Sequence, residues 1–304
     1  MSTTPIDPIS VPRVLEGVAS AFDDMDFDAL KTAMDYVGQV SKKPKTAAMV
    51  LAGGSGERFK HEGGKQLVEI AGMPMLARSI AVFDAVPDVG LIVVVCPEER
   101  EREYVERAVD PFNFVTPIVM AHAGAIRQES AFAGLEKVPE EYEFVLLHDG
   151  ARPLINKELV EHLINVVKGN IDCDGAVVGV PSVDTLKVVE NQVIVGTPDR
   201  SVFWQAQTPQ LFRAGVYRRA HAAALSDGFV GTDDSSLIER LGGQVLMVQG
   251  KRDNIKLTVP EDYLVISAAI RSAFEERRKQ ARAAAQAAAE DSAAAEAEGG
   301  KARE

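Results

Sequence analysis

The stretch Met49–Leu67, MVLAGGSGERFKHEGGKQL, joins an apolar run to a glycine-rich turn and two cations. The run Ala47–Ala52 is bounded by turn residues, as expected of a central strand covered on both faces. The glycines that follow let the backbone turn tightly and present N–H groups to a ligand. Arg58 adds a planar guanidinium and Lys65 a mobile ammonium, which suit a polyphosphate. The sequence therefore predicts a phosphate-handling loop at the end of a core strand.

Two commoner glycine motifs do not fit this loop. A Walker loop needs a glycine five residues before the Gly-Lys pair and a Ser or Thr after it, where this chain has Phe59 and Gln66. The dinucleotide fingerprint needs a third glycine three residues after Gly56, and that count also reaches Phe59. Hydride chemistry is therefore not expected. The remaining alternative is a plain glycine-rich turn with solvated charges.

Composition limits the class of protein. With 304 residues, 46% of them hydrophobic and 26% charged, the chain is expected to form one large domain with appendages. No apolar run approaches the roughly 20 residues of a membrane span, and no signal peptide is recognisable, so a cytoplasmic protein without membrane contact is expected. The formal charge of -12 argues against nucleic-acid binding. Cys96 and Cys173 have no ligand-type spacing and are expected to be buried thiols.

Four segments differ in their pattern along the chain. Residues 1–45 have apolar positions at helical spacing and predict a helical extension of unknown function. Residues 46–272 alternate strand and helix patterns, which predicts an α/β sandwich with a mainly parallel sheet. Within them, residues 184–204 alternate with period two and predict a protruding β-hairpin arm. Residues 273–304 are rich in Ala and charge and predict a solvated helix that frays into disorder. The other expected strands are Gly90–Cys96, Pro117–Ala121, Phe144–His148, Gly175–Val180 and Gln244–Val248, and the arm is expected to turn at Glu190–Asn191.

A carboxylate stands at the end of one core strand. Asp149 follows Phe144–His148, at the carboxyl edge where open α/β sheets bind ligands. A hard oxygen ligand there suits Mg2+, which keeps waters and substrate phosphates around one or two carboxylates. The alternative is a helix-capping Asp. His148 is expected to be a packed strand residue rather than a base.

Polar groups also gather where later elements begin or end. Any one of these groups is compatible with a solvated turn, and that is the interpretation favoured for Asp233, Asp234 and Arg252. Taken together, the groups indicate a site more than a set of independent turns. They lie in Arg127–Ser130, Asp199–Arg200, Gly231–Asp234 and Asp253–Thr258.

Eight ordered blocks between about Ala47 and Ile270 resemble the sugar-phosphate cytidylyltransferases, most closely those acting on 2-C-methyl-D-erythritol 4-phosphate. The resemblance implies a Rossmann-like three-layer nucleotidyltransferase sandwich. It also implies that a polyol phosphate attacks the α-phosphorus of CTP and releases pyrophosphate, in non-mevalonate isoprenoid precursor synthesis. The blocks are LAGGSGERF, GKQL, GAIRQES, LLHDGARP, VDTLK, TPDRSVFWQAQTPQ, GTDDSS and DNIKLT.

The resemblance also implies roles for single residues. Arg58 and Lys65 would stabilise the charge of the transition state. Asp149 would hold Mg2+ or another divalent cation beside the nucleotide. Arg200 would reach across a homodimer, because the arm exchanges between subunits in this family. The nucleotide would be bound by Ala52, Gly53, Gly54, Gly124, Ser130, Asp149 and Gly150, and the polyol phosphate by Thr185, Arg200, Thr208, Thr232 and Lys256.

The chain departs from the family pattern at two places, and two rival functions remain open. Gly64 stands where the family usually has Pro before the Lys-Gln pair, and this adds backbone freedom next to Lys65. Ile126 stands where the family often has Thr. The nearer rival is ribitol 5-phosphate cytidylyltransferase, which differs in the polyol pocket. A rival of another class is a catalytically silent nucleotide-binding or assembly protein that recruits a partner through residues 1–45.

Overall fold

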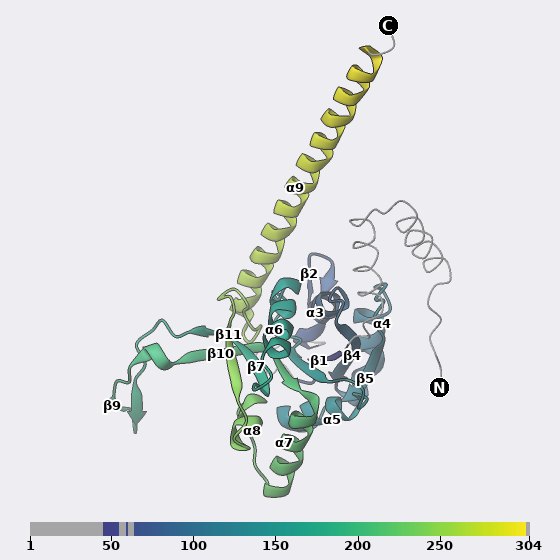
Figure 1. Ribbon diagram of the computed structural model, residues 1–304. Helices are drawn as coiled ribbons and strands as arrows, with labels where there is room; N and C mark the ends of the chain where they lie inside the picture. The colour runs from purple at the N-terminus through teal and green to yellow at the C-terminus, as the bar shows by residue number, and fades with distance from the viewer. Residues whose placement is uncertain (1–44, 55–58, 60–63, 302–304) are drawn as a thin grey trace. The chain divides into compact units, whose positions relative to one another are not determined.

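A seven-stranded sheet lies at the centre of the part of the chain that the computed structural model describes, residues 45–54, 59 and 64–301. The strand order is β11-β7-β10-β6-β1-β4-β5 (Figure 1). All neighbours pair in parallel except β10, which runs antiparallel to both β6 and β7. The mainly parallel sheet predicted from the sequence is confirmed. Its strands are β1 (Thr46–Leu51), β4 (Val89–Cys96), β5 (Ile118–His122), β6 (Phe144–Asp149), β7 (Gly175–Pro181), β10 (Trp204–Arg213) and β11 (Val245–Gln249).

Helices cover both faces of this sheet. Side chains of β1 alternate between the faces: Ala48 and Val50 pack in a cluster with α3, α4 and α6, whereas Ala47 and Met49 pack with α5, α7 and α8. Every residue of β1 is buried, as its unbroken apolar run predicts. The result is a three-layer α/β sandwich. The helices are α3 (Met75–Asp84), α4 (Glu101–Ala108), α5 (Arg127–Glu136), α6 (Lys157–Gly169), α7 (Ala214–Asp227) and α8 (Ser235–Arg240), with short helices at Lys65–Leu67, Glu98–Arg100 and Arg200–Val202.

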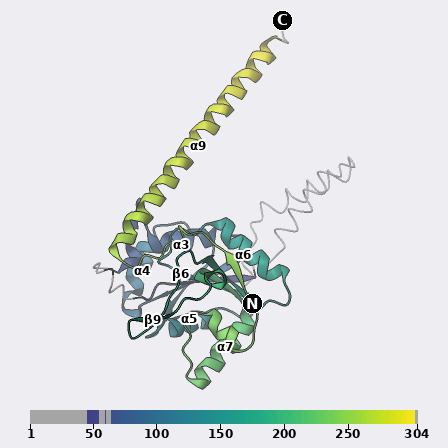
Figure 2. The same cartoon turned by 90° about the vertical axis from the view of Figure 1, so that its left-hand side faces the viewer.

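A smaller cluster joins the glycine-loop region to the last helix. Leu257, Ile266 and Ile270 pack against Ile70, of the small hairpin β2 (Glu69–Ile70) and β3 (Met73–Pro74). Helix α9 (Pro260–Lys301) begins in this cluster and extends away from the sheet (Figure 2). Its residues 271–276 are exposed. The helix predicted for the tail is therefore present, and its fraying stays a prediction. Within the described residues no helix, α9 included, is long and apolar enough to cross a membrane.

The predicted arm is a two-stranded ribbon separate from the main sheet. Strands β8 (Val188–Glu190) and β9 (Val193–Gly196) pair antiparallel. The turn falls at Asn191 and Gln192, which have φ of 48° and 68°, one residue later than the sequence suggested. Positive φ at both central residues is typical of a tight hairpin turn. The arm is thus confirmed with a corrected turn.

The remaining comparison with the sequence concerns the two cysteines, strand β10 and the N-terminal extension. Cys96 and Cys173 are buried free thiols, as predicted. Strand β10 was not expected, although it lies in the middle of the sheet. The helical extension predicted for residues 1–45 lies outside the described residues except for Lys45.

Candidate functional site

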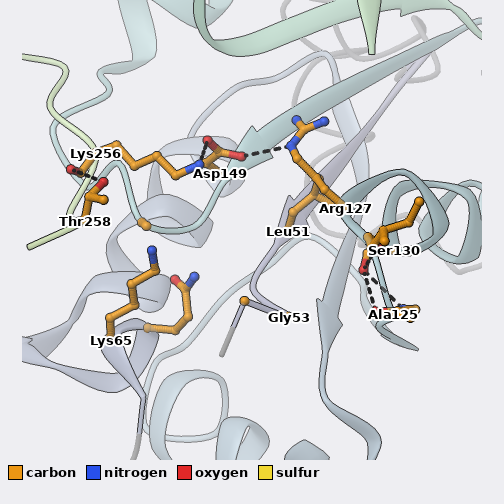
Figure 3. A pocket seen from close by; sticks show the side chains of 14 residues that line it. Leu51, Gly53, Lys65, Ala125, Arg127, Ser130, Asp149, Lys256 and Thr258 are labelled. Atoms are coloured by element: carbon orange, nitrogen blue, oxygen red, sulfur yellow. Dashed lines mark hydrogen bonds and ion pairs between the residues drawn. The ribbon is translucent and has the colours of Figure 1, made fainter. Parts of the chain in front are cut away.

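A cavity of about 690 Å³ opens at the carboxyl ends of β1 and β6 (Figure 3). The two strands pair in parallel with Leu51 beside Asp149, so the glycine loop and this carboxylate start from the same edge of the sheet. That position agrees with the rule for ligand sites in open α/β sheets. The lining residues are Leu51, Gly53, Gly54, Lys65, Gln66, Gly124, Ala125, Ile126, Arg127, Ser130, Asp149, Ala151, Lys256 and Thr258.

The first wall of the cavity is the glycine loop after β1. A Cβ atom on Gly53 would come within 2.3 Å of the Cβ of Ala123, so only glycine fits this approach to the next loop. Lys65 closes the loop, and its Nζ donates a hydrogen bond to the carbonyl oxygen of Leu257 at 3.0 Å. Gly64 has a φ of 70°, which the Pro usual in the family does not adopt. Arg58 lies outside the described residues, so its predicted role stays a prediction.

The opposite wall is the loop that leads into α5. The backbone N–H of Gly124 donates to Oγ of Ser130 at 3.1 Å, and that of Ala125 donates to Oε2 of Glu129 at 2.8 Å. These bonds fold the loop back onto the first turn of α5. A Cβ on Gly124 would lie 2.3 Å from the Cβ of Glu129, so the fold-back requires glycine. Gly124 and Ser130, both predicted nucleotide-binding residues, therefore meet at the cavity wall.

Three cationic side chains surround the carboxylate of Asp149 in the cavity. Oδ2 lies 2.8 Å from Nζ of Lys256 and 3.6 Å from Nε of Arg152, and Oδ1 lies 3.6 Å from Nε of Arg127. Burial alone would raise the pKa of this carboxyl. The positive charges of Lys256 and Arg127 outweigh burial and hold the pKa of Asp149 well below its usual range. Asp149 is therefore an anion surrounded by cations from α5, from the turn after β6 and from the segment before α9, and it does not cap a helix.

His148 and Thr208 support Asp149 from beneath the cavity. Oγ1 of Thr208 accepts a hydrogen bond from the backbone N–H of Asp149 at 3.0 Å and lies 3.1 Å from Nδ1 of His148. Nε2 of His148 lies 3.1 Å from the carbonyl oxygen of Arg152, a pairing that suits a neutral ring with its proton on Nε2. Burial lowers the pKa of His148 to about 4. His148 is thus a packed strand residue, as predicted.

The sequence interpretation of Asp234 was wrong. Its side chain is buried and forms an ion pair with Arg127, rather than facing water in a turn. Asp233 is half-buried and accepts a hydrogen bond from Nε2 of Gln210 at 3.0 Å. The solvated interpretation holds for Arg252, which is exposed. The ion pair supplies the physical reason, because a carboxylate is buried when a cation and hydrogen bonds compensate its lost hydration.

Three polar lining residues, Gln66, Arg127 and Thr258, were not among the residues to which the resemblance assigned a role. Arg127 spans the cavity wall between Asp149 and Asp234. Gln66 is only 2% exposed, and its Oε1 has no hydrogen-bond partner in the described structure. All three residues belong to motifs quoted from the sequence, GAIRQES, GKQL and DNIKLT, so their motifs were the available signal.

The cavity gathers part of the predicted residue set. Gly53, Gly54, Gly124, Ser130, Asp149, Lys65 and Lys256 line it. Ala52 and Gly150 do not line it, although their sequence neighbours do; Tyr104 donates to the carbonyl oxygen of Ala52, and the N–H of Gly150 donates to the carbonyl oxygen of Leu51. The remaining residues predicted to bind the polyol phosphate are outside the lining: Thr185, Arg200 and Thr232 are exposed, and Thr208 is buried.

The residues of the cavity fit a divalent cation bound through one protein ligand. In the described part of the chain no three His, Cys, Asp or Glu side chains cluster in a way that could hold a metal ion. Asp149 is the one carboxylate among the lining residues, and it is held ionised. Mg2+ commonly binds through one or two carboxylates and completes its shell with water and phosphate oxygens. The donor set therefore suits a metal carried with a nucleotide, and not a dedicated protein cage.

The sheet and its edge cavity are those of an α/β nucleotidyltransferase. Residues 46–272 match the model of the 2-C-methyl-D-erythritol 4-phosphate cytidylyltransferase family. The chain belongs to this family, which confirms the resemblance seen in the sequence blocks.

Individual relatives agree with the family match. The chain is 41% identical over 235 residues to 2-C-methyl-D-erythritol 4-phosphate cytidylyltransferase of Geotalea uraniireducens, covering 77% of this chain and 100% of the relative. It is 40% identical to the Bacillus licheniformis protein of the same name, covering 73% and 94%. The crystal structure of 4-diphosphocytidyl-2C-methyl-D-erythritol synthase from Anaerococcus prevotii superposes with a TM-score of 0.66 at 26% identity, covering 74% and 98%. The Thermus thermophilus enzyme gives a TM-score of 0.60 at 28% identity and the same coverage.

Proposed function

We propose that this chain transfers the cytidylyl group of CTP to 2-C-methyl-D-erythritol 4-phosphate, giving 4-diphosphocytidyl-2-C-methyl-D-erythritol and pyrophosphate. The charge of the cavity carries the proposal. Among its lining residues Lys65, Arg127 and Lys256 are cations, against the single carboxylate of Asp149. An excess of positive charge beside a glycine loop suits the triphosphate of a nucleotide and the phosphate of a second substrate. Family membership favours methylerythritol phosphate over the ribitol alternative.

The reaction needs positioning and charge stabilisation more than covalent chemistry from the protein. A phosphate oxygen of the polyol phosphate forms a bond to the α-phosphorus of CTP. The bond from that phosphorus to the bridging oxygen breaks, and pyrophosphate leaves with the electron pair. Lys65 and Arg58 stabilise the negative charge that crowds around the phosphorus, and Lys256 binds the incoming phosphate.

The nucleotide is held by the two loops that wall the cavity. The backbone groups of Gly53, Gly54 and Gly124 approach the base and ribose, and Ser130 keeps the second loop folded through its bond to Gly124. Asp149 would hold Mg2+, and the ion, when bound, would neutralise phosphate charge. Asp149 is suited to this role because its neighbours keep it ionised.

The polyol phosphate site is completed by a second subunit. Arg200 lies at the base of the arm, exposed, with its Nη1 donating to the carbonyl oxygen of Val183 at 2.5 Å. Since Arg200, Thr185 and Thr232 do not line the cavity of their own chain, we propose that the arm of one protomer brings Arg200 to the cavity of its partner in a homodimer.

Pyrophosphate release tests this function. Purified protein is incubated with CTP, Mg2+ and either methylerythritol phosphate or ribitol phosphate, with a chelator control. Turnover is expected with methylerythritol phosphate and to be lost in chelator. Turnover with ribitol phosphate alone would assign the rival substrate, and CTP binding without turnover on either substrate would favour the silent nucleotide-binding protein.

A further inference from the structure

A chain of buried polar side chains leads from the cavity into the layer of α7 and α8. Tyr217 is fully buried and stacks on Phe212 with ring centroids 5.1 Å apart. Its hydroxyl donates to Oδ1 of Asp234 at 2.5 Å. The other oxygen of Asp234, Oδ2, accepts a hydrogen bond from Nη1 of Arg127. Arg127 then presents Nε to Asp149, so four side chains from α7, the start of α8, α5 and the end of β6 form one continuous series.

Arg127 links the buried part of this series to the wall of the cavity. Its guanidinium contacts Asp234 with one edge and lies 3.6 Å from Asp149 with another. The planar guanidinium presents separate N–H groups to the two carboxylates in fixed directions, whereas a lysine ammonium is a compact point charge on a flexible stem. Tyr217 and Asp234 are buried on the side away from the cavity, whereas the Arg127 side chain is 34% exposed on the cavity wall. The buried pair of Tyr217 and Asp234 therefore fixes the orientation of the Arg127 guanidinium at the cavity wall.

The same series connects residues predicted to bind the polyol phosphate with residues predicted to bind the nucleotide. Asp234 ends the segment Gly231–Asp234, which carries the predicted polyol residue Thr232. Gln128, next to Arg127, fixes the other end of that segment, because its Oε1 accepts from the N–H of Gly231 at 2.8 Å. Asp149 belongs to the nucleotide side. Arg127 thus ties the loop of one substrate to the carboxylate of the other.

We propose that Tyr217 and Asp234 are positioning residues, which hold Arg127 so that its guanidinium keeps Asp149 and the Gly231–Asp234 segment in register at the cavity. This inference rests on the proposed cytidylyl transfer. Neither residue lines the cavity. Removing either one lets Arg127 move relative to Asp149, and misplacement by about 1 Å costs on the order of 100-fold in rate.

A double-mutant cycle tests the proposal with purified full-length protein. Tyr217→Phe removes one hydroxyl and is expected to lower kcat about tenfold, with the KM for CTP nearly unchanged. Arg127→Lys keeps the charge, loses the fork and is expected to lower kcat further. In the Arg127→Lys background, Tyr217→Phe is expected to have no additional effect on kcat, because its influence runs through the guanidinium. Melting temperatures of the same four proteins separate this coupling from a general loss of stability.

The control is Asp227→Asn, which breaks the exposed ion pair between Asp227 and Arg240 in the same layer. It should leave kcat unchanged. If the wild type is active and Tyr217→Phe keeps full kcat, or if the two substitutions multiply in kcat while their effects on melting add, the positioning role is wrong. Should Tyr217→Phe fail to fold, Asp234→Asn replaces it in the same cycle. An inactive wild type would instead overturn the proposed function.

Discussion

Substitution of Lys65 distinguishes a catalytic role from a structural one, because activity and stability are expected to respond differently. Its ammonium rests on the carbonyl oxygen of Leu257 at the edge of the cavity. Lys65→Ala is expected to lower kcat by about 100-fold or more, since one preorganised charge contact contributes roughly 3 kcal/mol to the transition state. Folding should be little affected. Steady-state pyrophosphate release and thermal melting measure both effects.

The matched control is Lys45→Ala, which removes an exposed lysine paired with Glu143 far from the cavity. Its activity should equal that of the wild type. Turnover of Lys65→Ala within a few-fold of this control would contradict the assignment of Lys65.

His148 gives the stability of the fold a specific pH dependence. Burial lowers its pKa to about 4, from an ordinary value of 6.5. Between pH 6.5 and pH 4 the imidazole of His148 is protonated in the unfolded chain and stays neutral in the folded chain. The free energy of unfolding is therefore highest above pH 6.5 and decreases as the pH falls toward 4. At about 1.4 kcal/mol per pKa unit, the loss is roughly 3 kcal/mol. Urea unfolding in metal-free buffer at pH 7 and pH 4.5 measures most of it.

The comparison protein for this measurement is His148→Gln, which cannot be protonated. Its free energy of unfolding should fall less than that of the wild type between the two pH values, by about 2 kcal/mol or more. Equal losses in the two proteins would show that other groups cause the acid instability.

Single residues of the site were predictable where a motif placed them at a strand end. Asp149 closes one apolar strand, Lys65 follows the glycine loop after another, and both residues line the cavity. The ion pair between Arg127 and Asp234 joins residues 107 positions apart, and no local pattern records such a pair. Asp234 therefore looked like part of a solvated turn, although tertiary structure buries it.

At the level of elements, apolar runs predicted the parallel strands. Strand β10 was not predicted, because its sequence contains many polar residues. That strand reads WQAQTPQLFR, with three glutamines and a proline, yet residues 207–212 are buried. Its polar side chains find partners from other segments: Gln207 donates to the carbonyl oxygen of Lys251, and Gln210 donates to Asp233. A central strand of this kind is stabilised by contacts that the sequence pattern does not contain.

The arm is the element whose surface calls for a partner. Val193, Ile194 and Val195 are between 52% and 63% exposed in the described chain, and Val202 is 75% exposed. An isolated two-stranded ribbon is at best marginally stable in water. Apolar residues along both strands would be covered by a second copy of the arm or of the core. This supports the proposal of a dimer formed through the arm.

For the whole molecule, a shared site makes activity depend on two chains at once. In the proposed dimer each site takes Lys65 from one protomer and Arg200 from its partner. Arg200→Ala should raise the KM for the polyol phosphate far more than that for CTP, because the lost guanidinium contacts only one substrate. Steady-state kinetics with each substrate varied in turn measure this difference.

Mixing two inactive proteins tests the shared site directly. Arg200→Ala and Lys65→Ala homodimers are each impaired at both of their sites. After subunit exchange, a mixed dimer has one site with both substitutions and one site with neither, so activity should rise above the sum of the separate proteins. At equal amounts and random exchange, half of the dimers are mixed, and about a quarter of all sites are intact. If labelled subunits exchange and the mixture stays inactive, or if the protein sediments as a monomer at assay concentration, each site is built from one chain and Arg200 acts elsewhere.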